Sequence, residues 1–277
     1  MAADRQGFTE GEIPELWNFI FNISLGMLHN EADAEDAAQE IFLTVSRNIG
    51  GFRGESSVKT WVYRIAKNHL LDFRQKRFKD PISFEIFEGD VRNFKPYNNE
   101  LGLTAEEEKQ YIEEVKTGCT AAMLQCLSPE DRFAYILGSI FGLDSETAAD
   151  ICGITEPAFR QKLSRARRKI ANFMNKNCGL LNEEAPCKCG KRLLIALERG
   201  RIDPDRIRFK TESRTIRDYL GELNTVDTVA AVFRDNPYID KKALFHSMLS
   251  DENAPYSEGI NLLQKYMGKE AHQGSEN

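Results

Sequence analysis

Residues 127–176 read LSPEDRFAYILGSIFGLDSETAADICGITEPAFRQKLSRARRKIANFMNK, and this stretch decides the fold. Its start, SPED at 128–131, combines a hydroxyl cap, a proline where no donor is needed and acids near the positive helix end. Apolar residues at helical spacing follow, and Gly142 ends this predicted helix. A second short helix is predicted from about residue 144 to Gly153.

A third helix is predicted to begin at Thr155, with Pro157 tolerated in its first turn. This helix is strongly basic, because only Glu156 opposes six cations: Arg160, Lys162, Arg165, Arg167, Arg168 and Lys169. Short helices joined by a tight turn predict a helix-turn-helix, and a basic third helix fits the DNA major groove. A charge run is more often a solvated helix face, but the caps, the turn glycine and the one-sided basicity together favour DNA binding.

The positive charge of the chain is concentrated in particular segments. The 277 residues carry a net charge of −6 and a pI of about 5.5, so the whole molecule is not a general nucleic-acid binder. Acids gather in residues 33–40, whereas residues 59–79 and 155–176 are basic. This separation indicates one face for a basic partner and another for phosphates.

Targeting signals are not evident in the sequence. The first twenty residues carry early charges without a long apolar core, and apolar runs such as 193–197 are too short to cross a bilayer. We therefore expect a cytoplasmic protein without membrane insertion, whose six cysteines are reduced thiols.

Helical periodicity dominates the rest of the chain. A helix is predicted over 12–28, and a second follows Asn30 with apolar residues at Ala34, Ala37 or Ala38, Ile41 and Val45. A third runs over 58–78. Residues 80–99 hold Pro, Gly and Asn without a steady period and predict a linker, whereas residues 104–126 are again helical.

The predicted fold class is all-α. We expect two small helical domains joined by a flexible linker, the second being the helix-turn-helix, and a helical C-terminal extension. The predicted divisions are 1–80, a linker at 81–119, the helix-turn-helix at 120–177, and a cysteine-containing extension at 178–277.

Two blocks of the chain together resemble the extracytoplasmic-function (ECF) class of bacterial RNA polymerase sigma factors. The first block contains DAEDAAQEIFL at 33–43, FRGESS at 52–57 and TWVYRIAKN at 60–68. The second runs from LSPE at 127–130 to LSRAR at 163–167. The resemblance is specific because both blocks occur in the right order.

The resemblance implies a non-enzymatic subunit without a cofactor that binds RNA polymerase core, recognises upstream promoter elements and assists strand opening. Its implied partners are the core enzyme, promoter DNA and an inhibitory anti-sigma protein. The helix over 33–43 would dock on the core, since acids around an exposed leucine suit a basic, partly apolar partner. The residues implied in docking are Asp33, Asp36, Gln39, Glu40 and Leu43.

The helix from residue 58, with the loop before it, would engage the promoter as it opens. Separating strands costs about 1.4 kcal/mol per base-pair step, which a protein without ATP recovers by capturing unstacked bases. Trp61 fits the hydrophobic core equally well. The residues implied here are Arg53, Trp61, Tyr63, Arg64, Lys67 and Asn68.

The basic helix would read a second promoter element as duplex. Glu156, Arg160 and Gln161 suit base edges, whereas the later arginines suit phosphates. The full predicted set is Thr155, Glu156, Arg160, Gln161, Lys162, Arg165, Arg167 and Arg168. The chain departs from the family pattern at Pro157 and at Phe159, where a smaller aliphatic residue is common.

Cys178, Cys187 and Cys189 form a cluster that could bind zinc, but structural zinc requires four ligands. No fourth ligand is obvious, since Cys152 and His246 are unsupported. A thiol redox sensor is a second interpretation, and reduced cysteines in a helical junction are the simplest. We therefore predict no metal site here.

Two other function classes compete with a sigma factor. A free-standing helix-turn-helix regulator would need neither an acidic docking helix nor a strand-opening helix. A zinc- or thiol-dependent enzyme would have to use the cysteine cluster, and nothing else in the chain has catalytic spacing.

Overall fold

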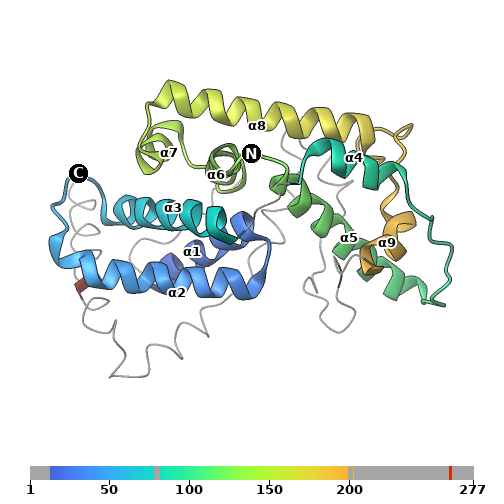
Figure 1. Ribbon diagram of the computed structural model, residues 1–277, viewed down its shortest axis with the longest axis horizontal. Helices are drawn as coiled ribbons and strands as arrows, with labels where there is room; N and C mark the ends of the chain where they lie inside the picture. Colours follow the sequence, from blue (N-terminus) through green and yellow to red (C-terminus); the bar gives the residue numbers. More distant parts are fainter. Residues whose placement is uncertain (1–12, 78–81, 199–201, 203–261, 264–277) are drawn as a thin grey trace, which may run out of the picture.

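The computed structural model describes residues 13–77, 82–198, 202 and 262–263 (Figure 1). Most of these residues are helical, and the only strand-like pairing among them is one isolated bridge. The all-α prediction is confirmed. The α-helices are α1 Ile13–Leu28, α2 Glu31–Asn48, α3 Val58–Arg77, α4 Phe84–Arg92, α5 Ala105–Gln125, α6 Pro129–Tyr135, α7 Ser145–Cys152, α8 Glu156–Asn177 and α9 Leu193–Glu198, and the short helical turns are η1 Ile49–Gly51, η2 Ile136–Ile140 and η3 Cys189–Arg192.

Local capping explains where these helices begin and end. The side chain of Asn30 accepts a hydrogen bond from the Asp33 amide at the start of α2, and Ser128 does the same for Asp131 at the start of α6. Gly153 ends α7 with a left-handed φ of 66°, which glycine adopts without strain. These boundaries agree with the sequence prediction.

The segment interpreted as a linker is partly helical, and that interpretation is wrong at residues 84–92. Ser83 caps α4 by accepting a hydrogen bond from the Ile86 amide, and Phe87 and Val91 bury one face of this short helix. Phe87 stacks on Phe173 of α8, with 5.1 Å between ring centroids. Tertiary packing therefore stabilises a helix too short to show a steady apolar period.

The first three helices form a small bundle. The predicted apolar stripe of α2 is buried between α1 and α3, with Ala34, Ile41 and Val45 at most 1 % exposed. Trp17 of α1 packs against Phe42 of α2, with 5.0 Å between their ring centroids. The core of this bundle leaves the acidic face of α2 outside.

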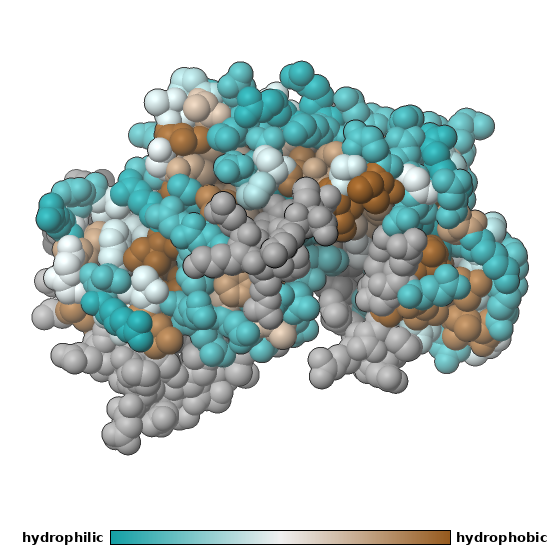
Figure 2. Space-filling view, in the orientation of Figure 1, coloured by the Kyte–Doolittle hydropathy of each residue, from teal (hydrophilic) through white to brown (hydrophobic). Residues whose placement is uncertain are grey.

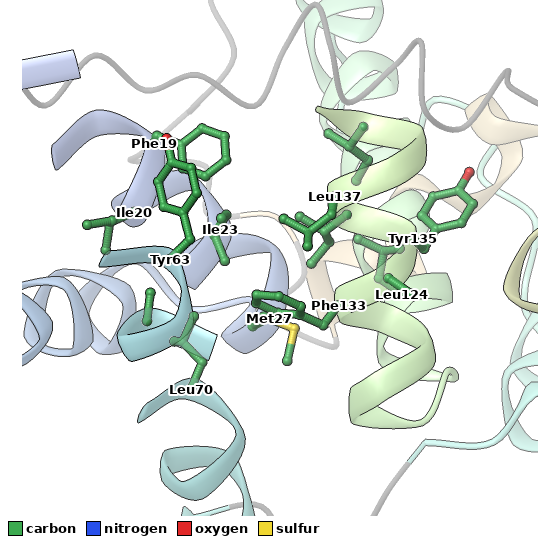
Figure 3. Close-up of a cluster of buried hydrophobic side chains, with 14 of the residues drawn as sticks. Phe19, Ile20, Ile23, Met27, Tyr63, Leu70, Leu124, Phe133, Tyr135 and Leu137 are labelled. Atoms are coloured by element: carbon green, nitrogen blue, oxygen red, sulfur yellow. The ribbon is translucent and has the colours of Figure 1, made fainter. Parts of the chain in front are cut away.

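This bundle and the helix-turn-helix share one hydrophobic core (Figure 3). The ring of Phe19 on α1 lies 4.4 Å from Tyr63 on α3 and 4.4 Å from Phe141 after η2. Met27 of α1 and Phe133 of α6 are buried in the same cluster. The two predicted modules therefore pack against each other in this arrangement.

A second, smaller core joins the end of the described chain to α5. Tyr97, Val115, Leu193 and Ala196 are buried together, beside α9. Residues 178–198 are thus folded onto the body of the protein, and most of the predicted extension 178–277 lies outside the described residues. No described helix is long and apolar enough to cross a membrane.

Candidate polymerase and nucleic-acid interface

Helix α8 presents a polar face outward along one long edge of the molecule (Figures 1 and 2). Its apolar face, including Phe159 and Leu163, is buried against α6, α7 and η2. A Cβ atom at Gly138 would lie 2.6 Å from Leu163 and 3.3 Å from Phe159. The larger Phe159 therefore fits because glycine faces it, which explains this departure from the family pattern.

The residues of α8 that were predicted to contact DNA differ in their solvent exposure. The exposed ones are Thr155, Arg160, Gln161, Arg165 and Arg168, whereas Glu156, Lys162 and Arg167 are half-buried. Arg160 forms an ion pair with Glu156 one turn earlier. Because both are surface groups, this pair is weak and competes little with a DNA ligand.

Three other cations of α8 contact side chains of the protein itself. Nε of Arg167 donates a hydrogen bond to Oγ of Ser139 at 2.8 Å. Arg165 and Lys169 lie 3.6 and 3.4 Å from the carboxylate oxygens of Asp131, whose side chain is only 8 % exposed. These contacts anchor α8 to α6 and η2, so the predicted phosphate role of Arg167 stays untested and competes with a structural one.

The acidic face of α2 is accessible. Asp36 and Glu40 are exposed, and Asp33, Gln39 and Leu43 are half-buried. Glu40 lies 3.2 Å from Nε2 of His69 on α3. All five predicted docking residues therefore reach one side of the bundle, with carboxylates around a partly exposed leucine.

Helix α3 places the predicted promoter-opening residues in different environments. Arg53 and Asn68 are exposed, and Trp61 is half-buried against Phe52, with 5.6 Å between ring centroids. Tyr63 is buried, and its burial raises the pKa of the phenol above its usual range. A base contact by Tyr63 is therefore contradicted in this arrangement, since its ring fills the core.

The two cations on α3 that were predicted to hold DNA contact the helix-turn-helix instead. Nε of Arg64 donates a hydrogen bond to the backbone oxygen of Asp150 at 3.0 Å, and its guanidinium pairs with the Asp150 carboxylate. Nζ of Lys67 donates to the backbone oxygen of Cys152 at 2.9 Å. Both acceptors lie in the last turn of α7, where unpaired carbonyls attract cations.

Sequence reasoning missed a buried arginine that joins the modules. Arg132 is 0 % exposed, and its guanidinium donates to the backbone oxygens of Met27, Leu124 and Gln125 at 2.6–2.9 Å. These carbonyls belong to the last turns of α1 and α5. Arg132 therefore caps two helix ends at once. A single arginine in a helix-starting stretch gives no sequence signal for this role.

The described residues hold no group of three His, Cys, Asp or Glu side chains arranged to bind a metal ion. The six cysteines are free thiols. Cys152 lies on α7, away from the predicted cluster, and His246 falls outside the described residues.

Comparison with known proteins agrees with the motifs on α2, α3 and α8. Residues 14–78 match the family model Sigma-70 region 2, and residues 117–170 match Sigma-70, region 4. The RNA polymerase sigma-H factor of Pseudomonas aeruginosa is 30% identical over 156 residues, which cover 54% of this chain and 78% of that protein. The chain belongs to the RNA polymerase sigma factor family.

Other relatives place this sigma factor in the ECF class. The ECF RNA polymerase sigma-E factor of Escherichia coli is 29% identical over 146 residues, covering 50% of this chain and 73% of that protein. A probable RNA polymerase sigma factor of Haemophilus influenzae is 28% identical over 156 residues, covering 53% of this chain and 80% of its own length. These matches give no support to a free-standing regulator.

Among solved structures, one chain in the co-crystal structure of the sigma factor RpoE with the anti-sigma factor NepR from Bartonella quintana is similar to this chain. The match has a TM-score of 0.40 and 21% identity, and it covers 58% of this chain and 92% of that chain.

Proposed function

We propose that this sigma factor binds core RNA polymerase through the exposed acidic face of α2 and reads promoter DNA through α8 and α3. The observation that carries the proposal is the placement of two oppositely charged faces on one folded body. Asp36 and Glu40 are exposed on α2, whereas Arg160 and Arg168 are exposed on α8. One surface thus suits a basic protein partner and the other suits a polyanion.

Helix α8 would lie in the major groove of a promoter duplex. Arg160 and Gln161 are exposed one and a half turns from the helix start, where side chains of a recognition helix reach base edges. Arg165 and Arg168 lie further along the helix and would hold phosphates, which fix the register without reading sequence. Thr155, Glu156 and Lys162 complete this proposed surface.

Helix α3 and the loop before it would contact the promoter element that opens. Exposed Asn68 and Arg53, with half-buried Trp61, suit this role. Arg64 and Lys67 can join them only if α3 and α7 separate, because both side chains are engaged on α7. We infer that the contact between α3 and α7 breaks when the sigma factor binds core and promoter, while Tyr63 stays in the core.

The same reasoning supports a non-catalytic, cytoplasmic protein. The proposed activity needs only surfaces for a protein and for DNA, and it uses no nucleophile or general base. Core polymerase and the promoter are cytoplasmic in a bacterium, so their subunit would be too. An anti-sigma protein that keeps α3 on α7 would be an effective inhibitor.

Binding to core polymerase tests the proposal against its alternative. The full chain, mixed with purified core enzyme and passed over a gel-filtration column, should elute with the core at a one-to-one ratio. A chain that binds promoter duplex tightly but never elutes with core would instead be a free-standing helix-turn-helix regulator.

A further inference from the structure

The segment after α8 folds back so that the backbones of two cysteines lie side by side. Cys178 and Cys187 form an isolated parallel β-bridge, in which the Cys187 amide donates to the Asn177 oxygen at 3.1 Å and the Gly179 amide donates to the Cys187 oxygen at 2.9 Å. Paired residues on neighbouring strands lie about 4.8 Å apart. That separation falls within the range of about 4.4–6.8 Å between the Cα atoms of disulfides.

The register of this pairing is fixed by glycine. A Cβ atom at Gly179 would lie 2.5 Å from the Cys187 oxygen, which a side chain could not avoid without moving the backbone. Cys178 is itself held at the end of α8, because its amide donates to the Met174 oxygen at 2.7 Å. The two cysteines are therefore brought together by the backbone and not by chance contacts of long side chains.

A buried cation, Arg192, lies beside this pair. Arg192 is 3 % exposed, and its Nε atom makes no hydrogen bond. Its guanidinium lies over the rings of Phe87 and Phe94, 5.8 and 5.6 Å from their centroids. Burial raises the pKa of the Cys187 thiol, and the neighbouring Arg192 opposes this rise. The positive charge of Arg192 would stabilise a thiolate at Cys187.

We propose that Cys178 and Cys187 form a reversible disulfide when the sigma factor reacts with hydrogen peroxide. Cys178 is the partly exposed member and reacts first: its thiolate attacks the O–O bond, a sulfenic acid forms, and the departing hydroxide takes up a proton as water. The Cys187 thiolate, beside Arg192, then attacks that sulfur. The S–S bond forms, the S–O bond breaks, and a second water leaves. Two thiols are oxidised by two electrons while one hydroperoxide is reduced.

The neighbouring cysteines fit this role less well. Burial and then the other thiols raise the pKa of Cys189 to about 12, and burial likewise raises the pKa of Cys119 on α5. Both thiols are therefore poorer sources of thiolate.

The disulfide would fasten the end of the DNA-reading helix to the segment that follows it. Cys178 directly follows α8, and Cys187 is separated by Lys188 from the turn η3 that packs against α5. A bond between them would oppose fraying of the last turn of α8. The modification thus lies on the proposed DNA-binding module but outside its exposed basic face.

Peptide mapping of the full chain tests the proposal. The reduced protein is treated with hydrogen peroxide, its remaining thiols are blocked with N-ethylmaleimide, and a digest is analysed by mass spectrometry without reductant. We expect a Cys178–Cys187 linked peptide, loss of two of the six thiols, and full recovery with dithiothreitol. Cys178→Ser and Cys187→Ser should each abolish the linked peptide, whereas the matched control Cys152→Ser should keep it.

Three results would overturn the proposal: all six thiols survive peroxide, the linked peptide joins a different pair, or metal analysis of the reduced protein finds zinc that Cys178→Ser removes. Because the wild-type map needs no variant, poor folding of a substituted chain cannot hide the answer. As a further check, Arg192→Met should slow formation of the disulfide severalfold while leaving the helical circular dichroism spectrum unchanged. An unchanged rate would remove the assigned role of Arg192.

Discussion

Arg64 on α3 donates a hydrogen bond from Nε to the backbone oxygen of Asp150 on α7, at 3.0 Å. The same guanidinium pairs with the Asp150 carboxylate, although both side chains are partly exposed. This contact joins the surface proposed to hold opening DNA to the module proposed to read duplex. In this arrangement Arg64, which is proposed to contact DNA, is engaged by α7.

Weakening this contact should favour the open form. Asp150→Asn removes the charge of an exposed pair, which is worth less than about 1 kcal/mol. We expect affinity for promoter DNA in the presence of core to rise by up to about fivefold, with a smaller gain at high salt. Glu146→Gln, an exposed acid earlier on α7, should leave the affinity unchanged. A fall in affinity for Asp150→Asn alone would show that Asp150 supports binding and does not restrain it.

Stability of the closed body should depend on Arg132. Replacing it with Met leaves the carbonyls at the ends of α1 and α5 without their donor in a buried site, which costs about 3 kcal/mol or more. Urea unfolding monitored by circular dichroism should show this loss. Arg168→Met, on the exposed face of α8, should change the free energy of unfolding by no more than about 0.5 kcal/mol. Equal effects of the two changes would contradict the capping role.

Low pH should reduce the stabilisation that the Asp144 side chain gives to the start of α7. Hydrogen bonds from Thr147, first from its backbone amide, hold the pKa of Asp144 below its usual value. A lowered folded pKa means that the cap stabilises the protein above the unfolded pKa of about 3.9 and is lost as pH falls through the lower folded value. Asp144→Ala should therefore cost about 1 kcal/mol at neutral pH. In urea titrations at several pH values, that cost should fade below about pH 4; a constant cost would exclude the charged cap.

Two arginines of α8 should contribute differently to DNA binding: Arg160 to base preference and Arg168 to affinity for any duplex. Arg160→Ala should lose about 1–3 kcal/mol at one base pair and relax preference there. Arg168→Ala should weaken all duplexes alike and reduce the slope of log affinity against log salt by about one. Binding to a library of promoter duplexes at two salt concentrations measures both effects. Uniform weakening by both changes would show that Arg160 also contacts only phosphate.

Core binding should depend on the acidic face of α2. Replacing Asp36 and Glu40 together by Asn and Gln should lower affinity for core polymerase at least about tenfold, because it removes the charge complementarity of the docking face. Binding of duplex by α8 should be spared. Glu106 and Lys109, exposed on α5, provide a matched pair of control substitutions. Retained core affinity in the α2 variant would place the docking face elsewhere.

Much of the fold follows from local sequence signals. The caps at Asn30 and Ser128 and the turn at Gly153 are made by residues within a few positions, so pattern and propensity predict them. The exposure of Asp36 and Arg160 follows from helical periodicity in the same way. Such features depend on neighbours along the chain, which the sequence displays directly.

The remaining features depend on contacts between distant residues. Tyr63 has an aromatic ring that could stack on a base. It is buried because it packs against Phe19, which also packs against Phe141. Arg132 and the pairing of Arg64 with Asp150 likewise join segments far apart in the chain. Helix α4 was missed because its two buried residues, Phe87 and Val91, are too few to show a period. These features depend on long-range packing, so local sequence patterns could not predict them.

Transcription in vitro tests whether this chain acts as a promoter-specific initiation subunit. Purified core polymerase is mixed with the full chain and a library of linear promoter duplexes, and the RNA products are sequenced. We expect RNA that starts at defined sites only when both proteins are present. Its synthesis should depend on Arg160 and on the pair Asp36 and Glu40. Tight duplex binding without any RNA product, under conditions where another sigma factor initiates on the same core, would contradict it.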